Sequence, residues 1–136
     1  MLRQDDMIKS QLVLYGWRAG HAYGGHLAST AIMGVIANRV KLGWGSWLDV
    51  IADIPSKSAV TEQSLEMPQI WSPEFVRLLH TVEGVFDSSS PDLSCGAVYF
   101  ADLAKPITNP WFQEKILSDL QMHRRVADMS SLTFFI

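Results

Sequence analysis

The chain has 136 residues and a formal charge of −3, and its 48% apolar and 18% charged residues are typical of a protein that buries a core. This composition excludes an intrinsically disordered chain, and the length fits one domain over residues 1–136. The 11 Lys and Arg residues form no basic run, so nucleic acid is not an expected partner.

The amino-terminal region and the apolar runs bear on the compartment. Lys9, Ser10 and Gln11 interrupt the early apolar residues, so no signal-peptide core can be drawn. The longest apolar stretch, residues 31–37, is far shorter than the roughly 20 residues that span a bilayer. We therefore expect a chain that is made in the cytoplasm and has no membrane as its partner.

Three helices are expected in the first half of the chain. The apolar spacing predicts the first over residues 5–17, fraying at Gly16 and Gly20, and the second over residues 26–42. Gly34 lies within the second helix and suggests a close contact with another helix. A capping box, in which Ser46 is the cap and Asp49 follows three residues later, predicts a short helix over residues 47–53.

The second half of the chain mixes helix and strand signals. Residues 57–69 are expected to form a loop able to line a cleft, and Ser72, Pro73 and Glu74 begin a helix that runs to Phe86. A turn, a strand, a long helix and a final strand are expected over residues 87–91, 97–101, 109–120 and 132–136. The two strands are plausible partners, so the expected fold is α+β and mainly α, with one small hairpin or two-stranded sheet.

No metal or cofactor site is expected. His21 and His26 are five residues apart, which does not align two ligands on one helix face, and Cys95 is the only cysteine. A lone cysteine excludes an internal disulfide, and we expect Cys95 to be a small buried thiol. Asp92 resembles a turn residue whose carboxylate accepts hydrogen bonds from its own backbone.

The aromatic residues carry more information about function. Ring faces that are exposed near helix ends can stack on sugar rings, although packing in the core is the alternative for each of them. The five tryptophans stand at Trp17, Trp44, Trp47, Trp71 and Trp111. Trp71 is the favoured one because it lies at a helix entry, directly before Ser72 and Pro73.

Two segments resemble a known family. Val35-Ile36-Ala37-Asn38-Arg39-Val40 is similar to the Val-Ile-x-Asn-Arg helix motif of the SleB-type cell-wall hydrolases, the spore-cortex-lytic and phage lysin group. The segment from Pro91 to Phe100 is similar to that family's Asp-x-Thr-x-Gly-Ala-x-Tyr-Tyr motif, and Gln69-Ile70-Trp71 matches a tryptophan motif between them. The resemblance implies a lysozyme-like, mainly helical fold and cleavage of peptidoglycan glycan strands, as a lytic transglycosylase or muramidase of bacterial or phage origin.

The family's catalytic glutamate is missing from this chain. The corresponding segment is Tyr15-Gly16-Trp17-Arg18-Ala19-Gly20-His21, with Trp17 in place of the acid, and a tryptophan cannot transfer the proton that this chemistry needs. His21 and Asp92 are the remaining catalytic candidates. The residues expected to contact glycan are Trp17, Tyr23, Trp71 and Tyr99, in a cleft between residues 15–26, Trp71 and residues 92–100.

Asn38 and Arg39 are expected to be supporting residues, with Arg39 paired to Asp92 or Asp102. Three hypotheses stay open: a peptidoglycan-cleaving enzyme, an inactive relative that acts as a glycan-binding or protein-interaction module of a phage, and a chance match. If the match is not chance, the helix at residues 35–40 should pack beside residues 97–100. The site of action implied by the resemblance is the periplasm, the cell wall or a virion.

Overall fold

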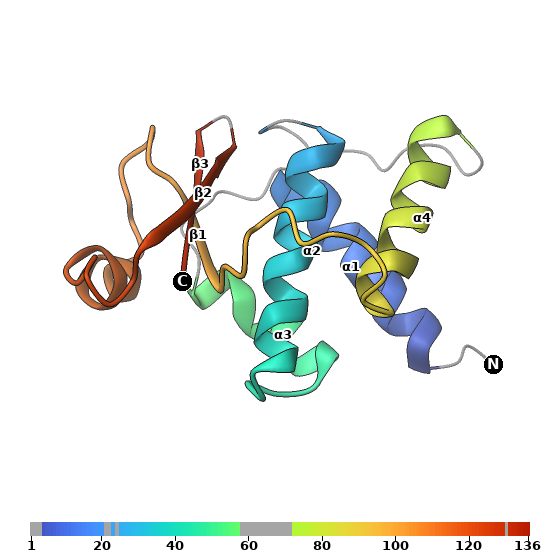
Figure 1. The fold of residues 1–136 in the computed structure, drawn as a ribbon, viewed down its shortest axis with the longest axis horizontal. Coiled ribbons are helices and arrows are strands. Elements are labelled where there is room, and N and C mark those ends of the chain that lie inside the picture. The colour runs from blue at the N-terminus through green and yellow to red at the C-terminus, as the bar shows by residue number, and fades with distance from the viewer. Residues whose placement is uncertain (1–3, 21–22, 24, 58–71, 130) are drawn as a thin grey trace.

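The computed structural model describes residues 4–20, 23, 25–57, 72–129 and 131–136. It is mainly helical with a small antiparallel sheet, which is the predicted fold class. Figure 1 shows helix α2 with the sheet on one side and helices α1 and α4 on the other. The elements are α1 (Gln4–Gly20), α2 (His26–Lys41), α3 (Trp47–Asp53), η2 (Ile54–Lys57), α4 (Pro73–Phe86), β1 (Tyr99–Asp102), α5 (Pro110–Phe112), η3 (Gln113–Leu117), β2 (Arg125–Met129) and β3 (Leu132–Phe135).

Helix α1 packs closely on α2 through its two glycines. A Cβ atom at Gly16 would lie 2.5 Å from Met33 Cε, and one at Gly20 would lie 2.7 Å from Ser29 N. The predicted helix end at residue 17, with fraying at Gly16, is wrong, because α1 runs on to Gly20. The lack of a side chain at the two glycines lets the two backbones approach, and this contact offsets their low helix propensity.

The start signals of α3 and α4 are confirmed. The Ser46 hydroxyl accepts a hydrogen bond from Asp49 N at 3.2 Å, and the Ser72 hydroxyl accepts one from Phe75 N at 3.2 Å. Each serine thus satisfies one of the amides that a helix leaves without a partner in its first turn. Helix α3 ends at Asp53 and continues as the 3₁₀ turn η2.

The sheet has the order β1-β3-β2, with both pairs antiparallel. The predicted pairing of the last strand with the strand near residue 99 is confirmed by the register, in which Tyr99 lies opposite Phe135. The third strand, β2, is absent from the predicted two-stranded sheet. Its residues are exposed or half-buried and its ladder is irregular between Arg125 and Ala127, so it lacks the alternating pattern that identifies a strand.

The long helix predicted over residues 109–120 is much shorter. After α5 the chain forms the π-helical turn η3, in which Ser118 N donates to Gln113 O at 3.2 Å. The Asp119 carboxylate then accepts from Met122 N at 3.2 Å, which favours a turn over continued helix. Leu120, the last residue of the predicted helix, is exposed.

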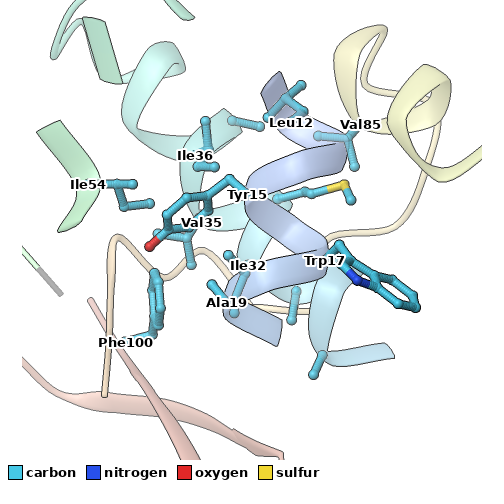
Figure 2. Packing of buried hydrophobic residues seen from close by; sticks show 14 of the residues in the cluster. Leu12, Tyr15, Trp17, Ala19, Ile32, Val35, Ile36, Ile54, Val85 and Phe100 are labelled. Carbon is cyan, nitrogen blue, oxygen red and sulfur yellow. The ribbon is translucent and has the colours of Figure 1, made fainter. Parts of the chain in front are cut away.

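The main core forms around α2, where residues 28–37 are all buried. Side chains from α1, η2, α4 and the sheet surround it, and Figure 2 shows Leu12, Ile36, Ile54, Val85 and Phe100 converging there. A second small cluster joins the far face of the sheet to α5 and η3 through Phe112, Ile116 and Phe135. None of the helices in the described part of the chain is both long and apolar enough to cross a bilayer.

Candidate functional site

Asn38 joins the two segments that carry the family resemblance. Its side-chain amide, on α2, donates hydrogen bonds to Ala97 O at 2.9 Å and to Asp92 Oδ2 at 2.9 Å. Gly34, one turn earlier on α2, leaves room for the loop that contains Asp92. A Cβ atom at this position would lie 2.8 Å from Asp92 Oδ1. The helix at residues 35–40 therefore packs beside residues 97–100, as the resemblance implies, and the close contact at Gly34 is with a loop rather than a helix.

Asp92 is the acceptor at the centre of this loop. It accepts from Ser94 N at 2.9 Å, from Gly96 N at 2.8 Å and from the Ser94 hydroxyl at 2.6 Å, which confirms the predicted turn role. Burial opposes ionisation, but the hydrogen bonds from Ser94, Asn38 and Gly96 outweigh it and lower the pKa of Asp92 below its ordinary value. A general acid needs a raised pKa, so this geometry makes Asp92 a structural carboxylate.

Arg39 supports the sheet from inside the protein. It is 1% exposed, and its Nε donates to Val98 O at 2.7 Å while Nη2 donates to Lys57 O at 3.2 Å. The expected pairing with Asp92 or Asp102 is wrong, because the guanidinium is directed to backbone carbonyl groups and Asp102 instead lies 3.8 Å from Lys105 Nζ. Burial lowers the pKa of Arg39 to about 10, partly offset by Tyr99, Tyr15 and Asp53, so Arg39 stays charged at neutral pH.

Above Arg39 lies a group of four rings that we call the aromatic platform: Trp44, Tyr99, Trp111 and His123. Tyr99 is its centre, with ring centroids 5.7 Å from Trp44, 5.9 Å from Trp111 and 5.4 Å from His123. These spacings are typical of tilted and edge-to-face aromatic pairs. The platform brings together the loop after α2, β1, α5 and the segment before β2.

Cations accompany the aromatic platform. Arg39 Cζ lies 5.2 Å from the Trp44 ring centroid and 5.5 Å from that of Tyr99, and Lys57 Nζ lies 5.6 Å from Trp44. Cations at this range are attracted to the ring faces and hold the rings in place. Burial raises the pKa of the Tyr99 hydroxyl despite the opposing charges of Arg39 and Lys57, so Tyr99 stays neutral at neutral pH.

Trp44 is the most exposed ring of the platform, at 40%, and its loop is built to present it. Gly43 and Gly45 flank it with φ angles of 82° and 148°, which L side chains rarely adopt. The Trp44 amide donates to Arg39 O at 3.0 Å and closes the loop on the end of α2. At the opposite edge, His123 Nδ1 lies 3.1 Å from Ile136 O and donates to it, because a carbonyl oxygen can only accept.

Two of the expected glycan-contacting residues that the structure describes have little exposed surface. Trp17 is 8% exposed and Tyr23 is 6% exposed, so both rings are largely in the core. Figure 2 shows the Trp17 indole on the side of α1 away from Phe100, the neighbour of Tyr99 in β1. His21, Trp71 and most of the predicted loop over residues 57–69 lie outside the described residues.

Sequence reasoning found Tyr99, and it named Trp44 and Trp111 only within the general set of tryptophans. Glycines on both sides of Trp44, and Asn109-Pro110 before Trp111, were the available signals. No local pattern marks His123, which reaches Tyr99 only because β3 brings the end of the chain to that place.

Cys95 corrects another expectation. It was predicted to be buried, but it is exposed, in the turn that Asp92 organises and with a positive φ of 56°. The turn that fixes Asp92 and Gly96 points the side chain of Cys95 out of the protein. Within the residues that the structure describes, no group of three or more His, Cys, Asp or Glu side chains is arranged to hold a metal ion.

Comparison with known proteins finds no family model, no curated protein and no solved structure that matches the chain. The family resemblance therefore rests on the motifs alone.

Proposed function

We propose that this chain binds the glycan strands of bacterial cell-wall peptidoglycan on the aromatic platform, as a binding relative of the cell-wall hydrolases. The observation that carries the proposal is the surface position of Trp44, 40% exposed, beside the half-buried rings of Tyr99 and Trp111. Sugar rings present apolar C–H faces that stack on aromatic rings. Several adjacent rings fit a polymer of such sugars better than a single small ligand.

The contact between the two resembling segments supports the choice of peptidoglycan over other polysaccharides. Asn38 and Asp92, the polar residues of the two motifs, meet at 2.9 Å, and the same segments carry Arg39 and Tyr99 into the aromatic platform. The residues that create the resemblance thus also build the candidate binding surface.

Binding is favoured over cleavage because neither residue 17 nor residue 92, two positions considered for the acid, offers a proton donor. Trp17 stands at the position of the family's acid and is buried, and Asp92 accepts hydrogen bonds that lower its pKa. A carboxyl group in that state is ionised at neutral pH and has no proton to give to a glycosidic oxygen.

The test is a binding titration with soluble glycan strands prepared from peptidoglycan. Trp44→Ala should weaken binding by about fivefold, since one aromatic stacking contact contributes about 1 kcal/mol. Leu42→Ala is the matched control, because Leu42 is exposed in the same loop and is not aromatic. Equal affinity of Trp44→Ala and the unmodified protein would contradict the aromatic platform as the binding surface.

A release assay separates binding from cleavage. The purified protein should bind insoluble peptidoglycan without releasing soluble muropeptides. Release that is abolished by His21→Ala would instead establish the enzyme hypothesis, with His21 as the proton donor.

A further inference from the structure

A small cavity lies at the amino-terminal end of α2, at the opposite end of that helix from the aromatic platform. It has a volume of about 90 Å³, is partly open to solvent and is lined by three helices, with Trp17 from α1 as one wall. A single water needs only roughly 10–15 Å³ of such space, so a small solute fits. The lining residues are Trp17, His26, Ser29, Glu74, Arg77 and Leu78.

Ser29 is the first sign that this cavity takes a ligand. Its side chain is 0% exposed, and its hydroxyl has no hydrogen-bond partner among the described residues. The neighbouring hydroxyls are satisfied, since Thr30 donates to His26 O at 2.8 Å and Thr81 lies 3.0 Å from His26 Nε2. A buried hydroxyl without a partner destabilises a fold, and such groups call for a specific explanation.

The charges around the cavity are balanced and separated. Arg77 and Glu74 come from α4, and Arg77 is in none of the ion pairs formed by the described residues. The amino-terminal end of α2 adds a partial positive charge, and its cap, Gly25, supplies no side-chain hydrogen bond. Burial, reinforced by Arg77, lowers the pKa of His26, so this ring is neutral at neutral pH.

We propose that this cavity binds a small α-amino acid, with its carboxylate toward the Ser29 hydroxyl and Arg77 and its ammonium group toward Glu74. One cation and one anion on the walls match the two charges of a zwitterion. A phosphate dianion would meet a single guanidinium and the repulsion of Glu74. The Trp17 ring and Leu78 limit the side chain, so alanine should fit better than leucine.

The test is a titration followed by ¹⁵N–¹H spectra of the full chain, with L-alanine, propionate, inorganic phosphate and L-leucine as probes. Alanine should shift the Ser29 amide and the Trp17 indole signals to saturation, with at least fivefold tighter binding than propionate. Arg77→Gln should weaken the binding of alanine and of propionate at least tenfold. Glu74→Gln should reduce the affinity for alanine to that for propionate and leave propionate unchanged or tighter.

Arg125→Gln and Glu114→Gln change exposed residues on β2 and η3, away from the cavity lining, and should bind alanine as the unmodified protein does. Unsaturable shifts, binding unaffected by Arg77→Gln, or propionate, phosphate or leucine binding at least as tightly as alanine would each overturn the proposal. Because Glu74 and Arg77 are exposed, their variants should fold, and the dispersion of the same spectra checks this. The glycan titration uses a different surface, so either proposal can fail alone.

Discussion

Replacing Asn38 with alanine tests the junction between the two resembling segments. The substitution removes the hydrogen bonds to Ala97 O and to Asp92 Oδ2, both 2.9 Å long. One of these acceptors is a charged group, and hydrogen bonds to charged groups contribute about 1.5–3 kcal/mol against about 1 kcal/mol for neutral pairs. The expected loss in the free energy of unfolding is therefore about 3 kcal/mol, or roughly 10 °C in Tm for a chain of this size.

The pH dependence of that loss is the sharper part of the test. The folded protein lowers the pKa of Asp92, so Asp92 contributes stability above pH of about 4, and that stability is lost as the pH falls through the folded pKa. The hydrogen bond from the Asn38 side chain accounts for part of this lowering of the Asp92 pKa. Asn38→Ala should therefore destabilise the protein most at neutral pH and clearly less at pH 3.

Urea unfolding followed by circular dichroism gives the loss in unfolding free energy at pH 7 and at pH 3. Lys41→Ala, one turn further along α2 and exposed, is the control and should change the unfolding free energy by less than about 0.5 kcal/mol. A loss below about 0.5 kcal/mol for Asn38→Ala, or an equal loss at both pH values, would refute this account of the junction.

Gly20→Ala should destabilise the fold by about 1–3 kcal/mol in urea titrations, because its Cβ would lie 2.7 Å from the Ser29 backbone, and a neutral result would mean that α1 and α2 separate easily. Arg39→Leu should lower the unfolding free energy by about 2–4 kcal/mol by removing donors to Val98 O and Lys57 O, and a stabilised variant would show that the guanidinium is dispensable. Cys95 should react with a thiol reagent in the native protein at nearly the rate found in urea, whereas protection until unfolding would contradict its exposed position.

Local signals made most of the helices predictable. Serine caps with the correct spacing fixed the starts of α3 and α4, since a cap acts within three residues of the chain. The end of α1 could not be predicted in this way. Whether Gly20 frays or packs depends on Ser29, a residue in another helix that only the fold brings close.

The candidate site was less predictable because long-range contacts assemble it. Tyr99 was found from its motif, but its contact with His123 depends on strand pairing near the end of the chain. Arg39 was expected to pair with a carboxylate, but its partners are backbone carbonyl groups, which sequence does not distinguish. Asp92 behaved as predicted because its partners Ser94 and Gly96 are close in sequence.

The order of the strands has a consequence for how the protein is made. The middle strand, β3, is the last to leave the ribosome, and β1 and β2 have no ladder with each other. Helices α1, α2 and α4 can begin to pack during synthesis. The sheet and the aromatic platform can form only when Phe135 has been synthesised. Until that moment β1 leaves its ladder groups unsatisfied, and the nascent chain carries an edge open to association with other chains.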